Sequence, residues 1–160
     1  MSDSSKANIM VVDDDKALAD NLKEFLEKIG YRATAVYGGK EALESSRKAS
    51  YDLVITDLMM PEMDGVSLIK AIRVSDSKTP VLVITGYGTI ESAVQAIRNG
   101  AFDFIPKPFK LDELEIIINR ALERAQLARQ LGLFRGLTLA LLISVPIWLL
   151  LGILLMKWWR

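Results

Sequence analysis

The sequence predicts an α/β fold with a doubly wound, five-stranded parallel sheet and one C-terminal transmembrane helix. Three observations support this prediction. From Asn8 onward, short apolar runs rich in β-branched residues alternate with longer amphipathic stretches, the pattern of strand and helix units in a parallel sheet. The alternation gives five such units, enough for an open sheet covered on both faces. Near the C-terminus, the 21 residues 136–156 include no charged side chain.

The N-terminal residues 1–6 are polar and lack the apolar core of a signal peptide, so a disordered arm is expected there. The first apolar run then begins the sheet. Several runs do not alternate apolar with polar residues, because helices should cover both faces of a parallel sheet. In chain order, the expected strands are 8–12, 32–37, 53–56, 81–85 and 102–105.

An amphipathic stretch follows each expected strand, with apolar residues at helical spacing. The expected helices are 16–29, 39–49, 66–75, 90–99 and 111 to about 131. Gly30 and Gly100 follow two of them and are placed as C-terminal stops. The apolar positions of the last helix could pack on the sheet or on a partner helix, and for its first half we expect the sheet. These positions are Leu114, Ile118, Ala121, Ala125 and Ala128.

The expected domains are a sheet domain at 7–124, a basic helical extension at 125–135, a membrane span at 136–156 and an interfacial tail at 157–160. At 1.5 Å per residue, the charge-free run is about 31 Å long, which matches the hydrocarbon core of a bilayer. A buried core helix is the alternative, but five units leave no face that would bury a helix apolar all round. Pro146 removes one backbone hydrogen bond in mid-run and is expected to kink the helix.

Charge around the run gives it an orientation. Arg124, Arg129 and Arg135 precede it, whereas Lys157 and Arg160 follow it. This bias favours a single-pass protein of the inner membrane, with its sheet domain in the cytoplasm and its C-terminus across the bilayer. Trp158 and Trp159 would then lie at the far interface.

Small residues recur at every fourth position from just before the charge-free run to its middle. Such a ridge lets two membrane helices pair, so a homodimer is one expectation, although small residues are common in any span. The ridge consists of Gly132, Gly136, Ala140 and Ser144.

Composition limits the chemistry. The chain has no cysteine and no histidine, which excludes zinc fingers, disulfides, Ser-His triads and a phosphorylated histidine. Residues 1–123 hold 20 acidic and 15 basic side chains, and residues 124–160 hold five basic and no acidic ones. The acidic body argues against a nucleic-acid partner, and the basic tail suits anionic lipid headgroups of a bilayer.

Polar residues stand where the expected strands end. Asp13, Asp14 and Asp15 follow the first strand, and Asp57 follows the third. Because carboxyl ends of parallel strands share one edge, these side chains should converge there with Thr85 and Lys107. Clustered carboxylates repel one another unless a cation compensates, and Mg²⁺ is the expected one. Turn formation and helix capping would explain 13–15 alone, but not the polar groups after the other strands.

Four motifs at these strand ends resemble the receiver domain of bacterial two-component response regulators. They are VVDDD at 11–15, DLMMPEMDG at 57–65, TG at 85–86 and KPF at 107–109, in the family's order. The segments 85–89 and 100–109 are similar to the nitrogen-regulation type of transcriptional activator. The resemblance covers about residues 7–124 and implies a flavodoxin-like sheet with strand order 2-1-3-4-5.

The resemblance implies a role for each residue of the site. Asp57 would be the nucleophile, forming an aspartyl phosphate with a phosphoryl group from a histidine kinase, a phosphotransfer protein or a small acyl phosphate. Asp14, Asp57 and the backbone carbonyl of Met59 would bind Mg²⁺ directly, and Asp13 would bind it through water. Lys107 would pair with the phosphoryl oxygens and Thr85 would donate a hydrogen bond to one of them.

Two further roles are implied. Pro108 would follow a cis peptide bond that directs Lys107 into the pocket, with an ordinary trans turn as the alternative. Phe104 stands at an aromatic switch position, where a ring moves inward as Thr85 shifts toward the phosphoryl group. A permanently buried strand aromatic is the alternative for Phe104.

Met59 and Tyr87 differ from the receivers that lose their phosphoryl group fastest. Neither a thioether nor a phenol aligns a hydrolytic water, so slow autodephosphorylation is expected, unless Met59 simply packs on the rim. Beyond self-phosphorylation and this slow loss, no conventional enzyme activity is expected.

The expected function is that of a membrane-tethered phosphoacceptor in a phosphorelay. Phosphorylation would switch a surface that binds an unknown downstream protein. No helix-turn-helix or ATPase domain fits between Arg124 and the expected span, so a DNA-binding output is not expected. Two alternatives stay open: a membrane scaffold independent of phosphorylation, and a phosphate sink for a histidine kinase.

Overall fold

The computed structural model describes the backbone of residues 6–86 and 89–158, and the side chains there except those of 132–140, 145, 147, 149–150, 153–154 and 157. Residues 1–5 of the expected arm, Tyr87 and the end of the expected tail at 159–160 lie outside the described residues. The chain divides into two units, Met1–Ala125 and Gln126–Arg160.

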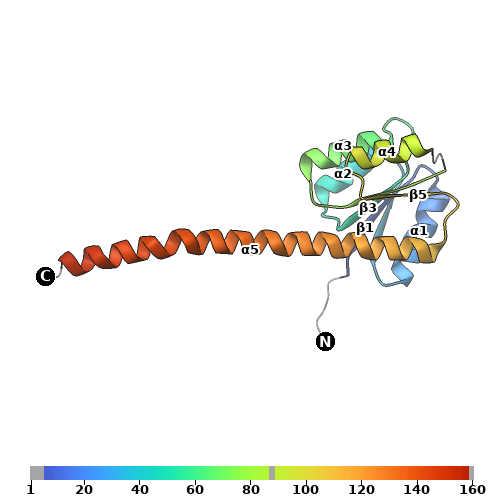
Figure 1. The fold of residues 1–160 in the computed structure, drawn as a ribbon. Coiled ribbons are helices and arrows are strands. Elements are labelled where there is room, and N and C mark those ends of the chain that lie inside the picture. Colours follow the sequence, from blue (N-terminus) through green and yellow to red (C-terminus); the bar gives the residue numbers. More distant parts are fainter. Residues whose placement is uncertain (1–5, 87–88, 159–160) are drawn as a thin grey trace. The chain divides into compact units, whose positions relative to one another are not determined.

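Five parallel strands form one sheet in the order β2-β1-β3-β4-β5, which confirms the predicted flavodoxin-like fold (Figure 1). The strands are β1 (Asn8–Val12), β2 (Arg32–Val36), β3 (Leu53–Thr56), β4 (Val81–Thr85) and β5 (Asp103–Pro106). The register pairs Val12 of β1 with Thr56 of β3, and Thr85 of β4 with Pro106 of β5. The residues that follow β1, β3 and β5 therefore start from one edge of the sheet.

Helices cover both faces of this sheet (Figure 1). On one face, α1 (Lys16–Lys28) and the first turns of α5 (Leu111–Trp158) enclose a buried cluster that includes Ile9 and Val11. On the other, α2 (Gly39–Lys48), α3 (Gly65–Ser75) and α4 (Ile90–Arg98) enclose a second cluster that includes Met10 and Val12. Successive residues of β1 thus point to opposite faces, and the four from Ile9 to Val12 are all buried, which explains why the strand shows no polar alternation.

Side chains at the turns fix where the helices begin and end. The carboxylate of Asp15 accepts from the amides of Ala17 and Leu18, which starts α1. Asp64 and Thr89 cap α3 and α4 in the same way. Gly30 and Gly100 both have φ of 101°, a left-handed conformation that ends a helix readily only at glycine, so both predicted stops are confirmed.

Helix α5 runs without a break from Leu111 to Trp158, whereas the last helix of the sheet domain was expected to end at about residue 131, before a separate membrane helix at 136–156. Its first part packs on the sheet through Leu114 and Ile118, both fully buried, as predicted. The backbone stays helical through positions 132 and 136. Pro146 lies inside α5, which continues on both sides of it.

The predicted membrane segment lies within this helix. Across the described residues, no helix combines the length and the hydropathy that crossing a membrane requires. The span at 136–156 therefore stays a prediction. The predicted pairing ridge stays one too, since the side chains at 132, 136 and 140 lie outside the described set.

Candidate functional site

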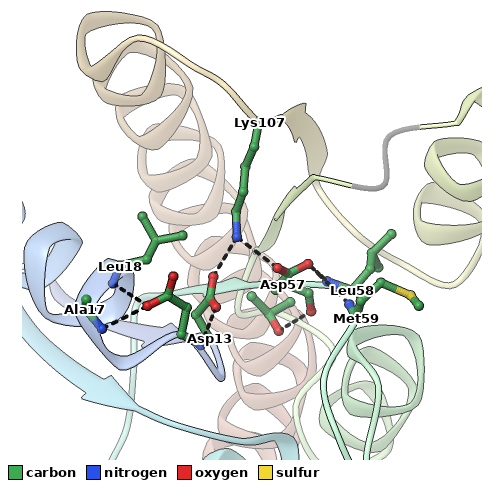
Figure 2. A network of polar contacts seen from close by, with 9 residues as sticks. Asp13, Ala17, Leu18, Asp57, Leu58, Met59 and Lys107 are labelled. Atoms are coloured by element: carbon green, nitrogen blue, oxygen red, sulfur yellow. Dashed lines mark hydrogen bonds and ion pairs between the residues drawn. The ribbon is translucent and has the colours of Figure 1, made fainter.

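Two carboxylates and one ammonium meet at the carboxyl edge of the sheet. The Lys107 Nζ atom lies 2.8 Å from Oδ2 of Asp13 and 2.9 Å from Oδ2 of Asp57 (Figure 2). Asp13 and Asp57 are buried, with 4% and 9% of their surface exposed. The structure thus brings together three residues that are 44 to 94 positions apart, as their places at strand ends predicted.

Backbone pairing continues past the strand ends and places these residues. The amide of Asp13 donates to the carbonyl of Val36 at 3.2 Å, and the amide of Asp57 donates to the carbonyl of Val12 at 3.0 Å. The amide of Lys107 donates to the carbonyl of Thr85 at 2.9 Å. Each site residue is therefore anchored to a neighbouring strand. The Lys107–Pro108 peptide bond is cis, as expected.

The carboxylate of Asp57 is held on both oxygens. Its Oδ1 accepts from the amides of Leu58, at 2.5 Å, and Met59, at 3.2 Å, while its Oδ2 accepts from Lys107. Burial acts to raise the pKa of Asp57, but hydrogen bonds from the Thr85 hydroxyl, Lys107 and the Met59 amide outweigh it and lower the pKa. Asp57 is therefore an ionised carboxylate at neutral pH.

The pKa values of Asp13 and Lys107 are both raised, but for different reasons. Burial raises the pKa of Asp13 even though Lys107 and the Asp15 amide donate to it. Burial acts to lower the pKa of Lys107, but its two carboxylate partners outweigh this and raise it. The ammonium is thus kept protonated between two anions, and the three groups together have one net negative charge when all are ionised.

The donor set suits a hard divalent cation. Mg²⁺ is commonly held by one or two carboxylates together with waters, and Asp13 and Asp57 supply two carboxylates within reach of one ammonium. Asp14 is exposed, and among residues 6–86 and 89–158 no three acidic side chains form a metal-binding group. Direct ligation by Asp14 and by the Met59 carbonyl stays a prediction.

Thr85 and Phe104, the two residues of the predicted switch, lie on the adjacent strands β4 and β5, and their switch role stays a prediction. Thr85 is fully buried at the end of β4, and its hydroxyl bonds to Asp57. Phe104 pairs with Val83 of β4 and packs, partly buried, against the cluster on the α2, α3 and α4 side. Met59 is 56% exposed.

Two contributors to the site were not predicted. The Leu58 amide donates to Asp57, and only the fold of the β3–α3 loop shows this. Gly65 lies so close to Asp57 that a Cβ atom would overlap the Asp57 carbonyl oxygen. The motif at 57–65 contains both residues, but their spacing alone does not indicate these contacts.

Comparison with known proteins agrees with this geometry. The sequence profile described as "Response regulator receiver domain" matches residues 9–119. The chain is 37% identical over 123 residues to "Transcriptional regulatory protein ZraR" of Klebsiella oxytoca, which covers 77% of this chain and 28% of that protein. The chain thus spans about a quarter of the length of the curated relatives it matches.

Solved structures give the same picture. The crystal structure of NtrX from Brucella abortus superposes with a TM-score of 0.75 at 36% identity, over 79% of this chain and 29% of that one. The Francisella response regulator 1452 receiver domain superposes with a TM-score of 0.70 at 35% identity, over 74% of this chain and 98% of that one. The similarity to NtrX supports the predicted nitrogen-regulation-like subtype.

Proposed function

This chain belongs to the response regulator receiver domain family, and from that premise we propose that it is a phosphoacceptor whose nucleophile is Asp57. One observation carries the proposal. The Asp57 carboxylate is buried and ionised, and the Lys107 ammonium that it shares with Asp13 lies 2.9 Å from it. An ionised nucleophile beside a fixed positive charge is what phosphoryl transfer requires.

The transfer uses groups already in place. An Asp57 carboxylate oxygen attacks the phosphorus atom of the donor, a P–O bond forms to Asp57, and the bond between phosphorus and the donor's leaving atom breaks. With acetyl phosphate, the products are the aspartyl phosphate and acetate. Lys107 stays protonated and neutralises charge on the phosphoryl oxygens, and the Thr85 hydroxyl is close enough to donate to one of them.

We propose that Asp14, Asp57 and the backbone carbonyl of Met59 bind Mg²⁺ directly, and that Asp13 binds it through water. Bound there, Mg²⁺ supplies charge neutralisation for the transferring group. The raised pKa of Asp13 supports this assignment, because a buried carboxylate that is costly to ionise gains from a nearby cation.

We propose that one protein donates the phosphoryl group and that another protein binds the phosphorylated receiver. A histidine kinase or a phosphotransfer protein would supply the phosphoryl group. Because the Thr85 hydroxyl bonds to Asp57, a shift of Thr85 toward a phosphoryl group would leave space for Phe104, which packs partly buried beside β4. The change would be read by a protein that binds this side of the sheet.

The test is phosphoryl incorporation. The full chain is incubated with Mg²⁺ and acetyl phosphate, and its intact mass is compared with that of Asp57→Asn and of Asp112→Asn, a control that removes one carboxylate from the first turn of α5. A gain of one phosphoryl group is expected in the wild type and the control, but not in Asp57→Asn or with a chelator. Incorporation into Asp57→Asn would contradict the proposal, and no incorporation into a folded wild type would favour the scaffold.

We also propose that residues 136–156 attach the receiver to the inner membrane, with the receiver in the cytoplasm. The support is the sequence, because 21 residues lack charge and arginines are concentrated before them. The full chain should stay in the membrane pellet after alkaline extraction, Leu142→Arg should release it, and Leu127→Arg, outside the segment, should not. Wild-type protein in the supernatant would contradict attachment.

A further inference from the structure

The loop between β3 and α3 contains a strained turn at Glu62. The amide of Met63 donates to the carbonyl of Pro61 at 2.7 Å, and Glu62 between them has φ of 64°. This is a γ-turn of the rarer, positive-φ hand. Among the described residues, Glu62 is the one non-glycine residue with a positive φ. Such a conformation persists only where the surroundings enforce it.

The start of α2 supplies this enforcement. The Lys40 Nζ atom lies 2.9 Å from the carboxylate of Glu62. Next to it, Gly39 is so close to the loop that a Cβ atom there would lie 2.6 Å from the carbonyl oxygen of Met63. The loop is therefore packed against the start of α2 and also joined to it by an ion pair.

The other end of the loop is attached to the site. The amides of Leu58 and Met59 donate to Oδ1 of Asp57, and the Gly65 amide donates back to the Leu58 carbonyl at 2.9 Å. A short segment, 58–63, thus links the carboxylate of Asp57 to the ion pair on α2. A shift of the turn at Glu62 would therefore also displace the two amides that orient Asp57.

We propose that Lys40 and Glu62 are positioning residues for phosphoryl transfer, because their ion pair holds the strained turn and thereby keeps the Leu58 and Met59 amides on Asp57. This inference rests on the proposed function. The pair is exposed, with 65% and 69% of the two side chains accessible, so it contributes little to global stability. Its effect is local, because the ion pair prevents only the relaxation of the β3–α3 loop.

The experiment uses the full chain with acetyl phosphate and Mg²⁺ and measures the initial rate of phosphoryl incorporation. Lys40→Ala and Glu62→Gln should each be about two- to fivefold slower than the wild type, a range set by the strength of exposed pairs. Lys48→Ala, in the last turn of α2, removes the same charge from the same helix and should leave the rate unchanged. Urea unfolding midpoints should be the same in all four proteins.

Two further measurements distinguish an effect of the ion pair on the rate from an effect of net charge. Lys40→Arg and the exchange of Lys40→Glu with Glu62→Lys both retain a pair and should recover most of the rate. At about 1 M salt the Debye length falls to about 3 Å, so the ratio of wild-type to Lys40→Ala rates should approach one.

The outcomes distinguish the two proposals. If the wild type takes up no phosphoryl group, the proposed function fails and this inference fails with it. If the wild type is phosphorylated and Lys40→Ala and Glu62→Gln match it at low salt, the positioning role alone is overturned. Equal slowing by Lys48→Ala, or no recovery by the exchanged pair, would also overturn it, because the effect would then belong to net charge.

Discussion

Arg73 donates from Nε and Nη2 to the carbonyl oxygen of Gly100, at 3.1 and 2.8 Å. Its Nη1 also donates to the carbonyl of Thr79 at 2.7 Å. One guanidinium therefore joins the end of α3 to the turns before β4 and β5. Burial lowers the pKa of Arg73, but a guanidinium stays charged at any pH at which the protein folds.

Replacing this fork should destabilise the fold. Arg73→Lys keeps the charge but cannot donate to both carbonyls at once, so the free energy of unfolding should fall by about 2 kcal/mol. Urea unfolding would measure this. Arg98→Lys, at the exposed end of α4, is the control and should change the value by less than about 0.5 kcal/mol. Equal stability of both variants would contradict the role of Arg73.

Gly65→Ala should damage both stability and the site. A Cβ atom there overlaps the carbonyl oxygen of Asp57, and backbone cannot move aside as a flexible side chain can. We expect a loss of about 1–3 kcal/mol in the free energy of unfolding, together with slower phosphoryl incorporation. Gly38→Ala is the matched control, because nothing lies within 4 Å of a Cβ atom at that position. Wild-type behaviour of Gly65→Ala would show that the loop can move.

Asp13→Asn should stabilise the protein increasingly as pH rises. Burial raises the pKa of Asp13 above 3.8, so its protonated form stabilises the fold. That contribution is complete below the pKa of the unfolded chain and is lost as pH rises through the higher folded value. Unfolding without Mg²⁺, measured at about pH 3 and about pH 7, should therefore show that the stability of Asp13→Asn relative to the wild type is greater at the higher pH. A gain that shrinks with pH would reverse the assigned direction.

Thr85→Val should shift the pH dependence of phosphoryl incorporation. The Thr85 hydroxyl is one of the hydrogen bonds that lower the pKa of Asp57, and valine has the same shape without the donor. The pKa of Asp57 should rise in the variant. The acid limb of the rate profile should then lie at higher pH than in the wild type. An unchanged acid limb would assign the low pKa to Lys107 and the Met59 amide alone.

Phosphorylated protein should lose its phosphoryl group slowly. The exposed side chain of Met59 ends in a methyl group, which cannot orient an attacking water. Intact mass followed after removal of acetyl phosphate measures this lifetime, and a half-life of seconds would contradict the prediction. Met59→Gln places an amide at the same position and should shorten the lifetime several-fold, whereas Met59→Leu should not.

The predicted strands and helices agree with the structure to within about a residue, except at the end of α5, because burial on both sheet faces leaves a strong pattern in the sequence. The small differences have local causes. Strand β2 ends at Val36, one residue early, where the amide of Tyr37 turns to the side chain of Glu41 at 3.2 Å. The join between the last sheet-domain helix and the C-terminal helix was not predicted, because the two were assigned from different patterns: amphipathic spacing up to about residue 131 and a charge-free run from residue 136.

The site was predictable to the same extent and for a similar reason. Asp13, Asp57, Thr85 and Lys107 follow strand ends, and parallel topology brings strand ends together. Contacts made by loops were beyond prediction. The pair of Lys40 with Glu62 and the fork of Arg73 on Gly100 join residues 22 and 27 positions apart with no periodic pattern between them.

The division of the core by the sheet also bears on how this protein can evolve. The two buried clusters share no residue, and the strand backbones separate them. Substitutions on opposite sides should therefore act additively on stability. The core residues on the α1 and α5 side and those on the side that contains Phe104 can therefore change separately. Selection can then alter the packing on one face of the sheet with little effect on the other.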